Sequence, residues 1–185
     1  MNRNIYILTI LLVVILSASS NPILIDGQFN DWEEIEPIYI DVVGDGGSSG
    51  IDFRNIYVTN DERFLFIKIE CSIELSIQEN NYITLFIDTD NDLTNGAQFN
   101  GLGAELVWNF GMRNGIFYWS GYAYDINYAD IRLRTAPTIT STVFEIAIGR
   151  QEIIDGSPLF PENSVKLSLL DDTGGTIGDI VPNSG

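Results

Sequence analysis

The sequence predicts an all-β protein, folded as an antiparallel β-sandwich, and three observations support this. Short segments rich in β-branched and aromatic residues alternate with turns of glycine, asparagine and aspartate along most of the chain. No long stretch repeats its apolar residues with the 3.6-residue period of a helix. Apolar residues make up 45% of the 185 residues, which is enough for the core of one domain.

The expected strands follow one another at short intervals. They cover residues 64–69, 82–87, 104–110, 115–119, 122–126, 131–135, 142–148 and 165–170. In one of them, Phe144, Ile146 and Ile148 fall on the same face, which is the period of two expected for a strand with one face in the core. Short helical turns are expected only near residues 72–79 and 150–154.

The first 20 residues predict a cleaved signal peptide. Arg3 gives a positive start, an apolar run extends from Ile5 to Leu16, and Ala18 and Ser20 are the small residues that signal peptidase accepts. The alternative is a membrane anchor, but this apolar run is shorter than the ~20 residues that span a bilayer. Cleavage would leave residues 21–185 as a single sandwich module, secreted to the extracellular space or the periplasm, with no remaining membrane association.

Charge and composition exclude several classes of function. The net charge of −17 repels phosphate backbones and argues against nucleic-acid binding, whereas it suits a soluble exported protein or one that binds cations. The chain has no histidine, which excludes Ser-His-Asp catalysis and His-ligated zinc or haem. Cys71 is the only cysteine, so no internal disulfide holds the fold, and we expect this residue in the core or at a strand end.

The acidic segment 88–96 is the strongest candidate for a metal site. Asp88, Asp90 and Asp92 stand at alternate positions directly after an expected strand, where unpaired carboxylates repel one another. A calcium ion relieves that repulsion, because it takes six to eight oxygen ligands. Glu105 in the next expected strand is the predicted fourth protein ligand. The alternative is a turn without any ion, because aspartate and asparagine favour turns on their own account.

The same segment does not match the helical calcium loop called the EF-hand. Leu93 stands where that loop needs glycine, and Phe99 stands where it needs a bidentate glutamate. No helices are expected on either side. The prediction is therefore a calcium loop within a β-sandwich.

Several segments together resemble one known family. They are the opening Ile-Asp-Gly-Gln-Phe-Asn-Asp-Trp of residues 25–32, residues 52–66, the acidic block 86–106, residues 144–148 and residues 179–182. Taken together they resemble the family 9 carbohydrate-binding modules (CBM9) and their DOMON-like relatives, which are secreted β-sandwiches. The resemblance implies a jelly-roll-like sandwich, sugar binding, and a structural calcium ion held by the four acidic residues named above.

The chain departs from the family pattern at two places. Asn95 is inserted before Gly96 in the acidic block, and Gly149-Arg150 replaces a proline that often follows the strand ending at Ile148. The first departure affects the detailed geometry of the calcium loop more than it affects the fold.

A group of aromatic residues forms the second candidate site. Trp119, Tyr122 and Tyr124 are expected on one face of a strand–turn–strand unit, where flat rings can stack on the C–H faces of pyranose sugars. The alternative is ordinary core and cross-strand packing of these rings. For Trp32 in the opening motif, a position in the core is expected rather than contact with sugar.

The leading hypothesis is a non-catalytic, calcium-stabilised module that binds polysaccharide or oligosaccharide. The first alternative is a structural or adaptor domain without sugar specificity, and an exposed aromatic platform would distinguish the two. The second alternative is a carboxylate-based glycoside hydrolase. The chain has 26 acidic residues, so a carboxylate pair at glycosidase spacing proves little. No nucleophile elbow or phosphate loop is present, and an enzyme is not expected.

Overall fold

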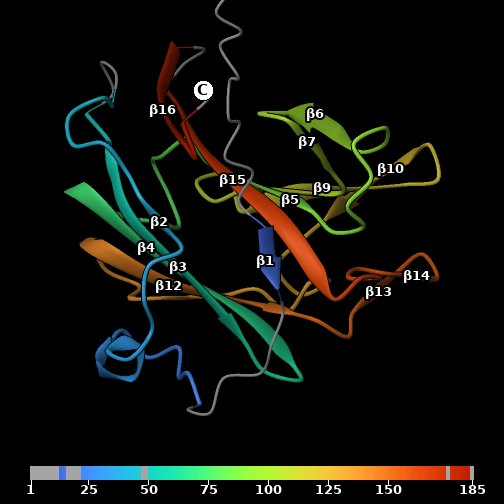
Figure 1. Cartoon of the computed structure of the whole chain (residues 1–185), viewed down its shortest axis with the longest axis horizontal. Helices are drawn as coiled ribbons and strands as arrows, with labels where there is room; N and C mark the ends of the chain where they lie inside the picture. The colour runs from blue at the N-terminus through green and yellow to red at the C-terminus, as the bar shows by residue number, and fades with distance from the viewer. Residues whose placement is uncertain (1–12, 16–21, 47–49, 174–175, 184–185) are drawn as a thin grey trace, which may run out of the picture.

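The computed structural model describes residues 13–15, 22–46, 50–173 and 176–183, which fold into two packed antiparallel sheets (Figure 1). The seven-stranded sheet contains β1 (Val13–Ile15), β5 (Ile83–Asp88), β8 (Leu106–Asn109), β9 (Asn114–Trp119), β10 (Tyr122–Ile126), β15 (Ser164–Thr173) and β16 (Thr176–Val181). Its order is β1-β15-β5-β8-β9-β10, and β16 also pairs with β15. The predicted antiparallel β-sandwich is confirmed.

The second sheet has five strands in the order β11-β12-β4-β3-β2. Their bounds are β2 (Tyr39–Ile40), β3 (Phe53–Asn60), β4 (Phe64–Leu75), β11 (Arg134–Ala136) and β12 (Ser141–Gly149). Two small hairpins complete the described structure: β6 (Ala97–Phe99) with β7 (Leu102–Ala104), and β13 (Ile153–Ile154) with β14 (Ser157–Pro158).

Helix is nearly absent from the described ranges. The one helical element there is the short 3-10 turn η1 (Asn30–Trp32), and none of the described residues form a helix long and apolar enough to cross a bilayer. The helical turn expected near residues 72–79 is wrong, because β4 continues to Leu75 and pairs there with Ser141 of β12. The turn expected near residues 150–154 is wrong as well, because β13 begins at Ile153.

Of the other expected strands, 122–126 is present with the predicted ends and the rest have shifted ends, except for residues 131–135. Ile131 and Arg132 lie in a turn, where Arg132 has a φ of +47°, and β11 starts only at Arg134. Ile131 is nevertheless fully buried. Its apolar side chain correctly indicates a core position but not a strand. The expected strand 104–110 is interrupted at Glu105, with β7 on one side and β8 on the other.

The main core fills the space between the two sheets. Phe144, Ile146 and Ile148 of β12 are fully buried there, as the alternation in the sequence predicts, and they share the core with Leu85 and Trp108 of the other sheet. Burial of each large apolar side chain contributes about 1.5–3 kcal/mol to stability.

A second apolar cluster covers the outer face of the five-stranded sheet. Trp32 is 1% exposed there and packs with Ala147, on the face of β12 opposite the main core. Glu145 on the same face is fully buried, and its Oε1 accepts the backbone N–H groups of Asp26 (2.8 Å) and Gly27 (2.6 Å). Its Oε2 accepts the indole N–H of Trp32 at 3.1 Å. The core position predicted for Trp32 is confirmed, and β12 is covered on both faces.

Cys71 on β4 is buried, and we expect its thiol to be unreactive in the folded protein. Burial raises the pKa of Cys71 to about 12, and the nearby carboxylates of Asp171 and Asp179 add to the increase. The thiolate is the reactive form, so Ellman's reagent should give almost no signal at about pH 8 until a denaturant is added, and then one equivalent. Rapid labelling of the native protein would contradict this buried position.

The predicted signal peptide, residues 1–20, lies outside the described residues apart from Val13–Ile15. Those three residues form β1 and pair antiparallel with β15, with Val14 opposite Val165. The cleavage site and the start of the mature domain stay predictions.

Candidate functional site

The acidic loop brings three of the four predicted metal ligands together. Asp88, Asp90 and Glu105 each offer a carboxylate oxygen, and these oxygens lie within 4.8 Å of one another. Asp88 is the last residue of β5, and Glu105 lies at the break between β7 and β8. Asp88 and Glu105 are fully buried, whereas Asp90 is half-buried. The order of the strands therefore places carboxylates from two segments at one point.

The hydrogen bonds of this cluster leave two buried oxygens unpaired. Lys166 Nζ lies 3.2 Å from Asp88 Oδ2, and the backbone N–H of Thr89 donates to Glu105 Oε2 at 2.8 Å. Asp88 Oδ1 and Glu105 Oε1 are buried without a partner. Burial raises the pKa of Glu105 to about 7, and repulsion by Asp90 and Asp88 adds to the increase. Buried carboxylate oxygens without partners are costly, and a bound cation removes that cost.

Asp92, the remaining predicted ligand, does not join this cluster. Its side chain is exposed, and its Oδ1 accepts hydrogen bonds from the hydroxyl (2.7 Å) and the backbone N–H (2.9 Å) of Thr94. These bonds lower the pKa of Asp92. Asp92 also donates its backbone N–H to Asp90 Oδ1 at 2.8 Å. The spacing of the aspartates predicted three converging carboxylates, but the carboxylate of Asp92 instead bonds to the backbone and hydroxyl of Thr94 in its own turn.

Two glycines and an aromatic pair hold the acidic loop against the β6–β7 hairpin. Gly96 has a φ of +65°, and a Cβ there would lie 2.5 Å from a carbonyl oxygen of β7. A Cβ on Gly103 would lie 2.4 Å from the carbonyl oxygen of Asn95. Phe99 stacks on Phe86 of β5, with ring centroids 4.1 Å apart. Phe99, one of the two residues that do not fit the EF-hand pattern, therefore anchors this hairpin to the sheet.

The aromatic residues Trp119 and Tyr122 face each other across a tight hairpin. The turn residues Ser120 and Gly121 have φ values of +50° and +80°, as in the type I′ turns that join twisted strands. The register of β9 and β10 places Trp119 directly opposite Tyr122. Trp119 is half-buried and stacks on the buried ring of Phe117, with centroids 6.1 Å apart and planes 8° from parallel. Tyr122 is 68% exposed.

Tyr124, the third residue of the predicted aromatic site, lies next to Tyr122, with ring centroids 6.4 Å apart and planes tilted by 47°. Its ring packs partly against the main core, as that of Trp119 also does. A hydrogen bond to Asp155 raises the pKa of Tyr124. Tyr124 is therefore a neighbour of Tyr122 but does not line the hollow beside it.

The acidic loop and the aromatic hairpin form the two walls of one cleft of about 270 Å³. Figure 1 shows β10 and the β6–β7 hairpin at the same end of the molecule. The lining residues are Thr94, Asn95, Gly96, Tyr118, Trp119, Ser120, Gly121 and Tyr122. The side-chain amide of Asn95 also donates to Asp90 Oδ2 at 2.9 Å, which connects the cleft to the carboxylate cluster. Two segments that the sequence marked separately thus belong to one site.

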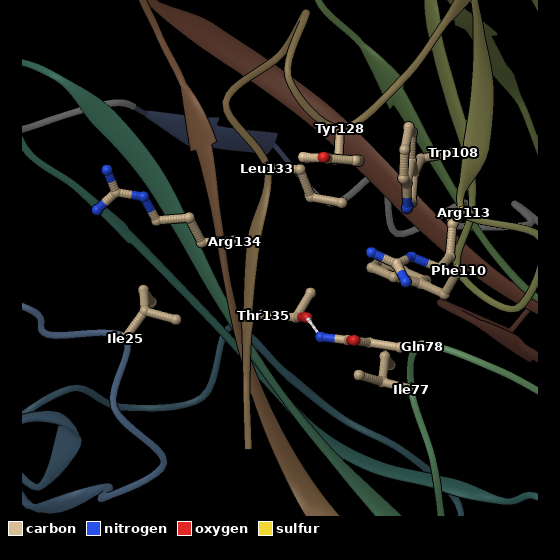
Figure 2. A pocket seen from close by; sticks show the side chains of 10 residues that line it. All are labelled: Ile25, Ile77, Gln78, Trp108, Phe110, Arg113, Tyr128, Leu133, Arg134 and Thr135. Carbon is tan, nitrogen blue, oxygen red and sulfur yellow. Dashed lines mark hydrogen bonds between the residues drawn. The ribbon is translucent and has the colours of Figure 1, made fainter. Parts of the chain in front are cut away.

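A second hollow, of about 230 Å³, was not marked by any sequence pattern (Figure 2). Trp108, Tyr128 and Arg113 line it together with Gln78 and Thr135, whose side chains share a 2.8 Å hydrogen bond. The indole N–H of Trp108 is buried without a partner, and Figure 2 shows this edge of the ring turned toward the hollow. Its walls come from segments far apart in the chain, so only the folded structure shows them together.

Comparisons with known proteins find similarity only among solved structures. No protein-family model matches the chain, and no curated protein matches it. One similar structure is a family 9 carbohydrate-binding module from Caldicellulosiruptor kristjanssonii in complex with cellotriose, with 14% identity, a TM-score of 0.46, and coverage of 85% of this chain and 74% of that one. A structure of such a module from the same organism in complex with glucose gives 14% identity, a TM-score of 0.46, and coverage of 86% and 78%. Both are distant similarities, at the level of the β-sandwich fold, to carbohydrate-binding module family 9.

Proposed function

We propose that this protein is an exported, non-catalytic module that binds carbohydrate in the cleft between the acidic loop and the β9–β10 hairpin. The observation that carries this proposal is the shared cleft, where Trp119 and Tyr122 face the polar residues Thr94 and Asn95. Sugar-binding surfaces combine flat apolar rings with nearby hydrogen-bonding groups, and this cleft offers both.

The aromatic wall of the cleft is held in place before any ligand arrives. Trp119 stacks on Phe117, which is itself fully buried, and the tight turn at Ser120 and Gly121 fixes the ends of both strands. A ring that is already ordered loses little conformational freedom on binding, so more of the contact energy appears as affinity. The exposed ring of Tyr122 supplies the accessible surface for the sugar.

We further propose that Asp88, Asp90 and Glu105 hold a structural calcium ion. The fit is supported by the two buried, unpartnered oxygens, Asp88 Oδ1 and Glu105 Oε1, in a cluster made only of oxygen donors. Calcium takes six to eight such ligands, so backbone carbonyls and water would complete the set. The ion would neutralise the carboxylates and fix Asp90, and through the bond from Asn95 it would order one wall of the cleft.

Sugar binding is tested by removing the tryptophan of the cleft. We expect the protein to bind members of a panel of β-glucans, xylans and chitin oligosaccharides with Kd values of about 10 μM to 1 mM by calorimetry. Trp119→Ala should weaken this binding by more than about tenfold, or ~1.4 kcal/mol, because a central aromatic ring carries much of the affinity. The melting temperature should fall much less than in Trp32→Ala, because Trp119 is half-buried whereas Trp32 is 1% exposed.

Two control variants distinguish loss of this cleft from use of another hollow and from loss of folding. Tyr128→Ala, in the hollow beside Trp108, should leave the affinity unchanged. If Tyr128→Ala abolishes binding while Trp119→Ala has no effect, the sugar occupies the other hollow and the cleft is wrongly assigned. If Trp119→Ala melts the protein as severely as Trp32→Ala, Trp119 is a core residue. Absence of binding across the whole panel would favour a structural or adaptor module.

A further inference from the structure

Four aspartates gather at another point of the sandwich, and the sequence marked none of them as a metal ligand, although Asp52 and Asp179 each begin a segment that resembles the family pattern. Asp41, Asp45, Asp52 and Asp179 each bring a carboxylate oxygen to within 4.8 Å of the others. Asp41 directly follows β2, Asp45 and Asp52 precede β3, and Asp179 belongs to β16. Figure 1 shows β16 and the segment between β2 and β3 at the same end of the molecule. We call these four residues the aspartate quartet.

Burial distinguishes the aspartate quartet from an ordinary acidic surface. Asp41, Asp52 and Asp179 are only 5%, 7% and 4% exposed, and Asp45 alone is open to solvent. Acidic side chains on a surface are hydrated, whereas buried ones need a compensating charge or hydrogen bonds. One positive charge is supplied by Arg54, whose guanidinium lies 3.0 Å from Asp52 Oδ2.

Three members of the aspartate quartet accept hydrogen bonds from other residues, whereas the carboxylate oxygens of Asp41 accept none. Asp52 accepts the backbone N–H of Gly44 at 3.1 Å, and Asp179 accepts that of Phe53 at 2.6 Å. Both carboxylate oxygens of Asp41 are buried and have no hydrogen-bond partner. Burial and repulsion by Asp179 raise the pKa of Asp41 to about 7. Asp41 is therefore a buried carboxyl group beside three other carboxylates, and neither of its oxygens has a hydrogen-bond donor within bonding geometry.

The backbone around the aspartate quartet is shaped so that its members converge. A Cβ on Gly46 would lie 2.5 Å from the carbonyl oxygen of Ile51, so only glycine allows the two sides of this segment to approach so closely. On the other side, Asn183 donates its side-chain amide to Asp45 and accepts the hydroxyl of Tyr39 at 2.8 Å. Residues close to the start and to the end of the described chain therefore contact each other at the aspartate quartet.

We propose that the aspartate quartet is a second divalent cation site, selective for calcium and separate from the acidic loop. All its donors are oxygens, which favours calcium over zinc, and four carboxylates supply more negative charge than Arg54 offsets. The ion ties the segment between β2 and β3 to β16. This clamp acts in a chain whose single cysteine allows no internal disulfide.

The decisive experiment counts ions per chain in wild type and in matched variants. Protein equilibrated with calcium and passed through a desalting column is analysed by inductively coupled plasma mass spectrometry. Wild type should carry two calcium ions, Asp41→Asn one and Asp90→Ala one. Asp41→Asn keeps the size of the side chain and removes its charge. Asp179→Asn keeps one acceptor oxygen for the N–H of Phe53, although it loses the acceptor for the N–H of Ile180, and it provides a second variant with the same expected loss of one ion.

Thermal melting distinguishes two ways of relieving the repulsion in the aspartate quartet: a bound cation, or a proton shared between two of the carboxyl groups. In EDTA, Asp41→Asn should melt at the same temperature as wild type or higher, because a buried uncompensated charge is gone. With calcium, its melting temperature should rise by less than that of wild type. The proposal would be overturned if Asp41→Asn and Asp179→Asn both still bind two ions. It would also be overturned if wild type binds a single ion and only Asp90→Ala loses it. One ion lost in Asp41→Asn but kept in Asp90→Ala would support it and refute the acidic-loop site.

Discussion

Trp32→Ala is expected to lower the free energy of unfolding by about 3–5 kcal/mol, the usual cost of removing a fully buried aromatic side chain from a packed cluster. Trp32 is 1% exposed beneath the N-terminal segment, and its ring packs edge-on against Tyr57, with centroids 6.5 Å apart. Its indole N–H also satisfies Glu145, so truncation leaves a buried carboxylate oxygen without that donor. Urea denaturation followed by fluorescence of the remaining tryptophans measures the change.

Two further variants divide this effect between packing and hydrogen bonding. Trp32→Phe keeps most of the apolar contact, so it should cost less than the alanine variant. Glu145→Gln keeps the shape but offers a single acceptor oxygen where two now accept three N–H groups, so a loss of about 1–3 kcal/mol is expected. An average substitution lowers the free energy of unfolding by about 1 kcal/mol. If Trp32→Ala lowers it by no more than that, the N-terminal segment does not stabilise the sandwich.

Removal of calcium is the second large effect that we expect. An ion bound only by the folded state adds about 2.7 kcal/mol when its concentration is a hundred times its Kd. The melting temperature should therefore fall in EDTA and recover with calcium, but recover less with magnesium, which requires a smaller octahedral site. Asp90→Ala should remove the contribution of the acidic loop to this response, as measured by differential scanning calorimetry.

Asp92→Ala is the matched control for the calcium experiment. Asp92 lies two residues from Asp90 on the same turn, but its side chain is exposed and bonded to Thr94 instead of the cluster. The calcium response of this variant should stay close to that of wild type. An equal loss in both variants would show that Asp92 is a ligand after all. A melting curve that EDTA does not move, in protein shown beforehand to carry metal, would exclude a structural ion.

The features that the sequence predicts correctly depend on residues close together in the chain. Alternation along a strand is a local pattern, and it correctly assigns Phe144, Ile146 and Ile148 to the core. Asp88 and Asp90 converge because they flank one turn. The same local pattern groups Asp92 with them, but its carboxylate bonds to its own turn instead, and spacing alone does not show which carboxylates fold back onto their own backbone.

The features that the sequence does not predict depend on contacts between distant segments. The aspartate quartet joins residues near position 45 to Asp179, and no local spacing in the sequence shows that these four carboxylates meet. The hollow beside Trp108 likewise draws on several strands and loops. Ile131 shows the converse error, because an apolar residue in a turn gives the same signal as one in a strand. The register of the strands and their order in each sheet depend on pairing between strands that are far apart in the chain, and a single sequence does not reveal that pairing.

The docking of the N-terminal motif onto Glu145 has a consequence for when the chain can fold. Asp26 and Trp32 find this partner 119 and 113 residues further along, so the motif has nothing to dock on until β12 has been made. Contacts of such high sequence separation slow folding, because a long loop must close before any of them forms. For export as we propose it, this order would leave the N-terminal motif undocked while the rest of the chain crosses a membrane, and the outer layer would close only after β12 has arrived on the far side.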